Sequence, residues 1–471
     1  MKNFTALVIL LLVYTNLYSQ ALEISNNHRY LQYSNDKSFI WIGDTAWELF
    51  HKLDREEADE YLTTRKEQGF TIIQGVVLAE LDGLKTPNAY GDVPLIDLDP
   101  ARPIEAYFEH VDYIINKANQ LGLVMGVLPT WGDKLYSINP GAGPVVFNQE
   151  NARKYGEFLG KRYKDNNIVW ILGGDRTIDS MEVLQIWRAM AEGINAGDGG
   201  KHLMTFHPRG GTSSSDWLHN EPWLDFNMYQ SGHVQRFNQV YEYAETDYLK
   251  LPTKPFLEGE PAYEDIAIKF WEYIDFGSAS RVPEDVLNKY GLIDNMDYFQ
   301  DGFFTDYDVR VHAYWNFLSG ACGYTYGNNA VWQMYRKNDD IVIPALQDWR
   351  ESLTSPGASQ MQYLHKFLEL YPVSEMVPDQ SVIYGKNPKT DMHMRAARSI
   401  NGEWLVVYLA QGQKVDVVTS KIKNSRIKGY WYNPKNGDKT HINEFVNGDI
   451  QAFEPPTSGI GNDWLLILEQ N

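Results

Sequence analysis

Cysteine is almost absent from this chain, because Cys322 is the only one among 471 residues. A single thiol cannot form an intramolecular disulfide, so disulfides contribute nothing to holding the fold together. The neighbours of Cys322 in "GACGYTYG", which begins at Gly320, are small and apolar. We therefore expect Cys322 to be a buried structural residue and not a nucleophile.

Positive charge is also scarce. The chain has 42 Lys and Arg against 62 Asp and Glu, which gives a formal net charge of −20. A field of this sign repels phosphate backbones and anionic membranes. Nucleic acid is therefore not expected as a partner.

Long apolar runs are missing after the N-terminus. In "MKNFTALVILLLVYTNLYSQ", Lys2 precedes an apolar run from Phe4 to Tyr14, and small and polar residues follow. This pattern predicts a secretory signal peptide over residues 1–20, and the run is shorter than the roughly 20 residues that span a bilayer. No Cys follows it to carry a lipid anchor. We expect an exported protein, periplasmic or extracellular, without a membrane span; the oligomeric state stays open.

Several catalytic motifs are lacking as well. The 11 His residues are scattered, and none belongs to an H-E-x-x-H motif. No G-x-S-x-G elbow of a serine hydrolase is present. "RGGTSSSDW", from Arg209, is rich in Gly and Ser but has no P-loop Lys, so we interpret it as an active-site loop. We expect no metal and no cofactor.

Residues 39 to about 330 alternate short apolar, β-rich runs with longer amphipathic segments such as "DREEADEYLTTRKEQG". Eight such βα repeats predict an α/β fold, a (β/α)8 TIM barrel, whose usual length is about 250 residues. A doubly wound sheet is the alternative, but "GDTAWELF" lacks its Gly-rich phosphate turn. The eight runs are "FIWIGD", "FTIIQGVV", "GLVMGVLPTW", "NIVWILGGD", "HLMTFH", "LDFNMYQ", "KPFLEGE" and "GACGYTYG".

The last hundred residues have a different pattern. "YPVSEMVPDQ" has two prolines and no helical period, and alternating runs such as "EWLVVYLA" and "KVDVVTS" follow it between turn-rich segments. We expect a catalytic barrel over 21–370, a linker over 371–380 and a small antiparallel β-sandwich over 381–471. The sandwich either binds polysaccharide or buttresses the barrel. The second is favoured, because Tyr430 and Trp431 are adjacent and face opposite sides of a strand.

Polar and aromatic residues cluster where the predicted strands end, which is the catalytic face of such barrels. Two of them are carboxylates directly after apolar runs, Asp175 and Glu260. A carboxylate pair facing a cleft is what glycoside hydrolysis requires. Glu258 is a rival for Glu260, because alternate residues of a strand point the same way. Glu260 is preferred because it is nearer the open end of the strand and Pro261 stops pairing there.

Ten further strand-end residues are candidates for substrate binding. Aromatic side chains form 14% of the chain, including 14 Trp and 30 Tyr, and such rings stack on sugars. Arg176 is a candidate to hold Asp175 or a substrate carboxylate, and Tyr229 to donate a hydrogen bond to Glu260. The ten candidates are Asp44, Trp47, Gln74, Trp131, Arg176, His207, Tyr229, Gln230, His233 and Trp332.

The stretches "WIGDTAWELF", "WILGGDR", "YQSGH" and "GEPAYE", in this order, resemble the apiosidase-like glycoside hydrolases of family 140. The resemblance covers roughly residues 22 to 370. The later stretches "RSINGEWLVVYLAQG", "IKGYWYNPKNGDK" and "FEPPTSGIGNDWLLIL" look like the β domain that accompanies these barrels, which is labelled collagen-binding.

The resemblance implies a barrel related to retaining glycosidases, with the acid/base after strand four and the nucleophile after strand seven. Asp175 and Glu260 occupy these positions. Gly-Gly-Asp stands here where many members of the wider clan have Asn-Glu, a departure that family 140 shares. The implied activity is the release of apiose from side chains of plant pectin. The alternative is a catalytically silent barrel that binds glycans for a cell-surface complex, and such a barrel has no need of two opposed acids.

Overall fold

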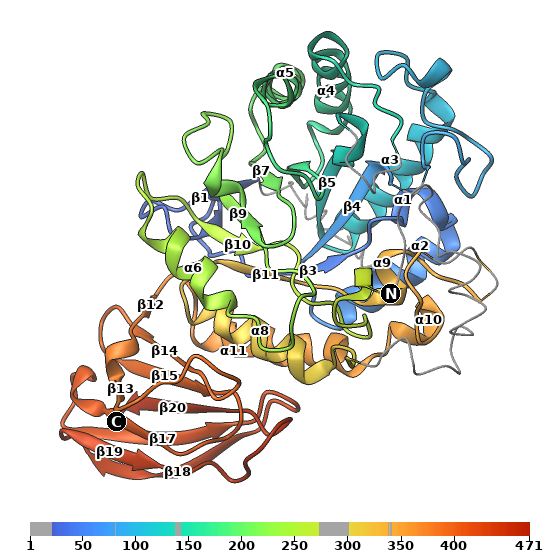
Figure 1. Ribbon diagram of the computed structural model, residues 1–471. Coiled ribbons are helices and arrows are strands. Elements are labelled where there is room, and N and C mark those ends of the chain that lie inside the picture. The colour runs from blue at the N-terminus through green and yellow to red at the C-terminus, as the bar shows by residue number, and fades with distance from the viewer. Residues whose placement is uncertain (1–20, 81, 137–142, 273–300, 338, 340–341) are drawn as a thin grey trace, which may run out of the picture.

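The computed structural model describes residues 21–80, 82–136, 143–272, 301–337, 339 and 342–471. The predicted signal peptide, residues 1–20, lies outside these ranges. The described part of the chain forms a barrel followed by a smaller, all-β domain (Figure 1). None of its helices is both long and apolar enough to cross a membrane.

Eight parallel strands form the barrel, and one lies in each of the eight predicted runs, so the predicted fold is confirmed. The hydrogen-bonded order is β7-β6-β5-β4-β3-β11-β10-β9. Between β7 and β9 the main-chain N–H of Asp225 donates to the Met204 carbonyl at 2.8 Å, and Thr205 Oγ1 donates to the Phe226 carbonyl at 2.7 Å. These bonds close the barrel. The strands are β3 (Trp41–Thr45), β4 (Ile72–Leu78), β5 (Val124–Thr130), β6 (Ile168–Gly173), β7 (Met204–His207), β9 (Asn227–Gln230), β10 (Phe256–Glu258) and β11 (Gly323–Tyr326).

Helices surround the barrel (Figure 1). The first long helix begins where the sequence predicts, because the Asp54 side chain and the Glu57 side chain cap each other's backbone N–H groups. The helices are α1 (Leu49–Lys52), α2 (Arg55–Glu67), α3 (Glu105–Gln120), α4 (Gln149–Tyr163), α5 (Met181–Asp198), α6 (Val240–Leu249), α8 (Asp306–Phe317), α9 (Asn329–Trp332), α10 (Trp349–Ser352) and α11 (Pro356–Leu370). A hairpin, β1 (Leu22–Ile24) and β2 (Leu31–Tyr33), precedes the barrel, and β8 (Thr212–Ser213) pairs antiparallel with β9.

Strand residues alternate between two apolar environments, which explains why the runs are apolar throughout. In β6, Val169 and Ile171 pack inside the barrel, whereas Trp170 and Leu172 pack against the surrounding helices. Cys322 is buried beside this interior, as expected, and its burial raises the pKa of the thiol to about 12. The alternation decides which side chains of each strand approach the barrel axis and the site above it.

The C-terminal domain is a β-sandwich, as predicted. A sheet of order β12-β14-β15-β20-β17-β18 faces a smaller one of order β13-β16-β19. Residues 371–380, assigned to a linker from the sequence, include β12, which pairs with β14. The strands are β12 (Met376–Pro378), β13 (Ile383–Tyr384), β14 (Met394–Ser399), β15 (Trp404–Leu409), β16 (Val415–Val418), β17 (Arg426–Tyr432), β18 (Lys439–Val446), β19 (Ile450–Phe453) and β20 (Trp464–Gln470).

The larger sheet of the sandwich packs on α8 and α11 of the barrel (Figure 1). Tyr314 of α8 stacks on Tyr408 of β15 with ring centroids 5.0 Å apart. Beside them Arg310 forms a buried ion pair with Asp463 at 2.8 Å, and the Tyr408 hydroxyl donates to Asp463 at 2.9 Å. Trp431 lies in the core between the two sheets, and Tyr430 packs on the opposite face. The barrel and the sandwich therefore share one continuous core.

Candidate active site

Glu260 lies just beyond the carboxyl end of β10, where the chain bends at Gly259. Gln74, fully buried inside the barrel on β4, donates from Nε2 to the Gly259 carbonyl at 3.0 Å. The Glu260 carbonyl accepts the main-chain N–H of Gly232 at 3.2 Å. These contacts fix the backbone around Glu260, and the residue is only 7% exposed. Gln74 was predicted to bind substrate, but in the structure it supports the backbone at the end of β10 from inside the barrel.

Two imidazoles face the Glu260 carboxylate from neighbouring strands. Nε2 of His207, the last residue of β7, lies 3.2 Å from Oε2. Nε2 of His233, which follows β9, lies 3.3 Å from Oε1. Burial alone would raise the pKa of Glu260, but the contacts with the two histidines outweigh this effect and lower the pKa to about 2. Glu260 is therefore ionised across the whole physiological pH range.

Asp175 follows β6 on a sharp left-handed turn. Gly173, Gly174 and Asp175 have φ values of 95°, 105° and 52°. The main-chain N–H of Gly174 donates to the His207 carbonyl at 3.0 Å, and the Gly174 carbonyl accepts from Gly132 at 3.1 Å. A positive φ is unfavourable for an Asp, by about 1–2 kcal/mol. The surrounding bonds hold this conformation, and the Asp175 side chain is 41% exposed.

The surroundings of Asp175 raise its pKa, opposite to the shift at Glu260. Desolvation of the carboxyl is the largest cause, and the negative charge of Glu260 is the second. Arg176 and Arg209 oppose the shift. Nη1 of Arg176 donates to the Asp175 carbonyl at 2.8 Å and lies 3.9 Å from Oδ2. Arg176 thus contacts Asp175, as one of its two predicted roles requires.

Aromatic rings form the wall beside His207. The Trp47 ring meets His207 edge-on with centroids 5.3 Å apart, and the Trp131 ring lies 5.7 Å from it. Trp47 Nε1 donates to the Tyr263 hydroxyl at 3.1 Å. Trp131 and Trp332 are both 5% exposed, so little of either side chain reaches solvent. Trp47 and Trp131 therefore pack beside the His207 imidazole, whereas Trp332 donates from Nε1 to Asn329 Oδ1 at 3.3 Å.

Two residues that were predicted to bind substrate have side chains on the outer face of the barrel, so these two predictions were wrong. Asp44 points outward from β3 and pairs with Arg65 of α2, with Oδ2 2.6 Å from Nε. Tyr229 points outward from β9, stacks on Tyr243 and donates its hydroxyl to Asn316. Successive residues of a strand face opposite sides, and each of these two residues lies an odd number of positions from an inward-facing residue of its strand, such as Trp41 in β3. Gln230, which follows Tyr229, is 4% exposed beside the loop glycine Gly210.

Glu258 is separated from Glu260 by the bend at Gly259. Its side chain is fully buried outside the barrel, where Ser231 donates to Oε1 and burial raises the pKa to about 8. The expectation that Glu258 and Glu260 point the same way is therefore wrong, because β10 ends at Glu258. The carboxylate whose charge acts on Asp175 is that of Glu260.

Two residues of the site were not predicted from the sequence. The Tyr263 hydroxyl lies against Glu260, and burial together with the Glu260 charge raises the pKa of this tyrosine. Glu80 stands two residues beyond β4, and the pKa of its carboxyl is raised well above the usual value by burial and by nearby acids, Asp175 and Glu260 among them. The rule that found Asp175, a carboxylate just after an apolar run, also applies to Glu80.

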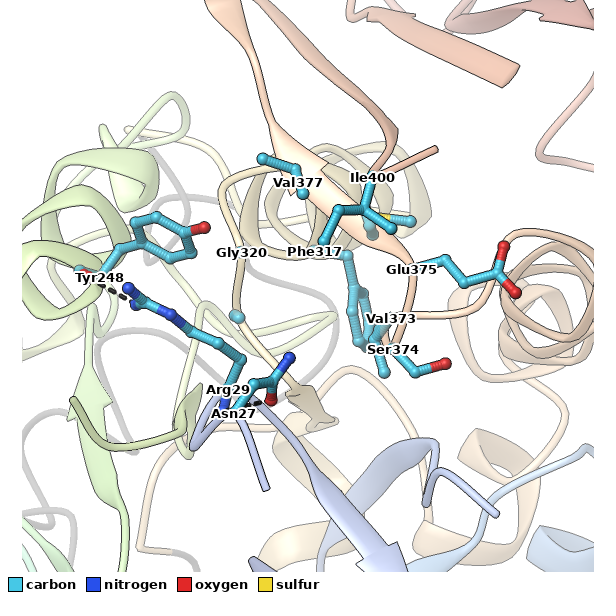
Figure 2. Close-up of a pocket in the computed structure, with 12 residues that line it drawn as sticks. Asn27, Arg29, Tyr248, Phe317, Gly320, Val373, Ser374, Glu375, Val377 and Ile400 are labelled. Carbon is cyan, nitrogen blue, oxygen red and sulfur yellow. Dashed lines mark hydrogen bonds between the residues drawn. The ribbon is translucent and has the colours of Figure 1, made fainter. Parts of the chain in front are cut away.

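A separate cavity of about 240 Å³ lies at the other end of the barrel (Figure 2). Tyr248 and Gly320, which line it, precede the strands β10 and β11, so it belongs to the amino-terminal face. Arg29 stacks on the Tyr248 ring there and donates to the Tyr248 carbonyl at 2.6 Å. This cavity does not include the carboxylate pair. Among the residues that the structure describes, no three His, Cys, Asp or Glu are placed to hold a metal ion.

Comparisons with known proteins agree with this geometry. A family model described as "Apiosidase-like, catalytic domain" matches residues 25–375, and one described as "Putative collagen-binding domain of a collagenase" matches residues 377–469. A solved structure titled "Glycoside hydrolase" is similar at 32% identity, over 96% of this chain and 97% of that one, with a TM-score of 0.83. A glycoside hydrolase family 5 from Bacteroides vulgatus ATCC 8482 is similar at 32% identity, over 96% and 93%, with a TM-score of 0.82. Curated proteins gave no match.

The turn before Asp175 generates a stability prediction. A Cβ added at Gly173 would collide with the His207 carbonyl oxygen, and φ is 95° there. We expect Gly173→Ala to lower the free energy of unfolding by clearly more than the roughly 1–2 kcal/mol of left-handed strain alone. Gly199→Ala is the matched control, because φ is 78° and nothing lies within 4 Å of its Cβ position. Urea unfolding of both variants measures the difference, and equal losses would contradict the close approach of β6 and β7.

Proposed function

The chain belongs to the apiosidase-like catalytic-domain family, and from this premise we propose that it is a glycoside hydrolase that uses Asp175 as acid/base and Glu260 as nucleophile. The observation that supports the proposal most strongly is that the pKa values of the Asp175 and Glu260 carboxyls are shifted in opposite directions. Contacts with His207 and His233 lower the pKa of Glu260, whereas desolvation and the charge of Glu260 raise the pKa of Asp175. The first shift favours the ionised form of Glu260 and the second favours the protonated form of Asp175, which are the forms that the two roles require.

In the first step Glu260 attacks the anomeric carbon while Asp175 donates its proton to the leaving oxygen. The glycosidic C–O bond breaks, the leaving group departs as a neutral alcohol, and the sugar is held as an ester of Glu260. Asp175 then takes a proton from water, which attacks the anomeric carbon and releases the sugar. Two displacements retain the anomeric configuration, so we propose a retaining mechanism. The influence of the Glu260 charge on Asp175 supports a short separation between the two carboxyls.

We propose a plant cell-wall glycan of the pectin type as substrate, with apiose as the released sugar. The family description supports the sugar. Arg176 beside Asp175, and the exposed Arg209 near it, support an acidic glycan, because they place positive charge on the leaving-group side of a strongly acidic protein. Export to the periplasm or the medium stays a proposal that rests on the residue pattern of positions 1–20. The shared core of barrel and sandwich supports a buttressing role for the C-terminal domain.

The assignment of the two acids generates the first functional prediction. Asp175→Asn and Glu260→Gln each keep the fold and lower kcat by about a hundredfold or more, because each removes an interaction made chiefly in the transition state. Glu258→Gln is the matched control, since this residue lies on the other side of the strand end. Rates on pectin-derived oligosaccharides, with circular dichroism to verify folding, test this. Unchanged turnover in Glu260→Gln together with loss in Glu258→Gln would contradict the assignment, and binding without turnover in the wild type would indicate a glycan-binding barrel.

The displaced pKa values generate a prediction on pH. Activity requires ionised Glu260 and protonated Asp175, so it falls as the pH rises through the elevated pKa of Asp175 and persists on the acidic side. We expect an optimum on the mildly acidic side or near neutral. Asp175→Ala flattens the alkaline limb and spares an aryl glycoside with a good leaving group, which needs little protonation. Equal losses on aryl glycoside and oligosaccharide, with the alkaline limb intact, would contradict the acid role of Asp175.

A further inference from the structure

The two histidines that face Glu260 are each fixed by a backbone donor on the other ring nitrogen. The main-chain N–H of Asp175 donates to Nδ1 of His207 at 3.3 Å. The main-chain N–H of Tyr263 donates to Nδ1 of His233, also at 3.3 Å. A ring nitrogen that accepts a hydrogen bond carries no proton, so each imidazole is neutral with its proton on Nε2.

The two Nε2 atoms face different oxygens of one carboxylate, and the contact of His233 has hydrogen-bond geometry. Nε2 of His207 lies 3.2 Å from Oε2 of Glu260, and Nε2 of His233 lies 3.3 Å from Oε1. The histidines were expected from the sequence to bind sugar hydroxyls. In the structure they are 0% and 6% exposed, and their inward nitrogens contact the carboxylate.

We propose that His207 and His233 form a neutral clamp, with one Nε2–H group facing each oxygen, which positions Glu260 and keeps it ionised without cancelling its charge. The proposal rests on the proposed function, because it concerns how the nucleophile of that reaction is held. Both histidines are positioning residues that act through Glu260.

The neutrality of the clamp has a chemical consequence. A Lys or Arg at hydrogen-bond distance would also keep Glu260 ionised, but its charge would offset the negative charge of the carboxylate. That negative charge has two uses here. It stabilises the positive charge that develops on the sugar in the transition state, and it helps to keep Asp175 protonated. Neutral imidazoles beside the carboxylate preserve both effects.

The groups around Glu260 are consistent with neutral imidazoles. From β7 and β9 the carboxylate faces His207 and His233, and from its own loop it faces the Tyr263 hydroxyl. Asp175 after β6 and Glu80 after β4 are further acids that interact with it. Arg176 is directed at Asp175, and the aromatic rings of Trp47, Trp131 and Tyr263 pack on the two imidazoles. The tautomers are therefore set by two backbone N–H groups and by ring packing.

The first test measures the tautomers directly, in the full chain with ¹⁵N-labelled histidine. Long-range ¹H–¹⁵N NMR at neutral pH, with signals assigned from His207→Gln and His233→Gln, is expected to show Nδ1 unprotonated and Nε2 protonated in both residues. A proton on Nδ1 of either residue, as the other tautomer or as imidazolium, would overturn the clamp. This measurement needs no substrate.

The second test removes the donors. We expect His207→Leu and His233→Leu each to raise the pKa of Glu260 by about one unit, the size of one hydrogen bond to a charged group. The measurement is the ¹³C titration of the Glu260 carboxyl, assigned with Glu260→Gln. His207→Gln and His233→Gln place a side-chain NH₂ near the carboxylate, so they should raise the pKa of Glu260 less. His365→Gln on α11 should leave the pKa of Glu260 unchanged. An unmoved Glu260 titration in both Leu variants would overturn the proposal.

Kinetic measurements distinguish a failure of the clamp proposal from a failure of the proposed function. With a 4-nitrophenyl apioside, the acid limb of kcat/KM should move upward in the Leu variants by the same amount as the Glu260 titration, and the Gln variants should restore it in part. If the NMR results are as expected but the wild type hydrolyses neither this compound nor pectin-derived oligosaccharides, the clamp is supported and the proposed function is contradicted. If the acid limb stays in place while the Glu260 titration moves, the histidines do not act through the nucleophile.

Discussion

The central constraint of this site is one buried carboxylate, Glu260, that must stay ionised. Burial disfavours its charge, and the two imidazoles of His207 and His233 reverse that effect. The rest of the cleft depends on this result, because the retained charge on Glu260 is one of the two causes that raise the pKa of Asp175. The barrel supplies the donors from two neighbouring strand ends and supports the Gly259 backbone through Gln74. Packing and the contacts with the histidines therefore shift the pKa values of the two proposed catalytic carboxyls in opposite directions.

The same contacts link the backbone of Asp175, the proposed acid, to Glu260, the proposed nucleophile. His207 accepts the main-chain N–H of Asp175 on one side of its ring and faces Glu260 on the other. The left-handed turn through Gly173 and Gly174 brings that N–H within reach. A strained turn that is held by surrounding bonds is common at functional sites, because the strain allows a geometry that a relaxed strand end would not adopt. The turn therefore explains why the buried strand β6 ends on two glycines and an acid.

The sequence predicted the fold class correctly, whereas it misplaced several side chains at the strand ends. Eight apolar runs separated by amphipathic segments were sufficient for the barrel, because parallel strands covered on both faces are apolar throughout. The sequence does not show which side of a strand each side chain faces at the strand end, because polar residues are tolerated on both sides there. Asp44 and Tyr229 were therefore wrongly predicted to face the site. The sequence also did not indicate that β10 ends at Glu258 and bends at Gly259, so Glu258 and Glu260 were expected to point the same way. Glu80 was missed although it follows an apolar run as Asp175 does.

The central claim is that Glu260 forms a covalent bond to the sugar while Asp175 acts as the acid. The most direct measurement is to trap the intermediate with an activated 2-deoxy-2-fluoro glycoside of the sugar that the enzyme releases, and to map the labelled peptide by mass spectrometry. We expect the label on Glu260, in the peptide that contains "LEGEPAYE", with no label in Glu260→Gln. A label on Glu258, Glu80 or Asp175, or turnover of the natural substrate with inversion and no trapped ester, would contradict the account.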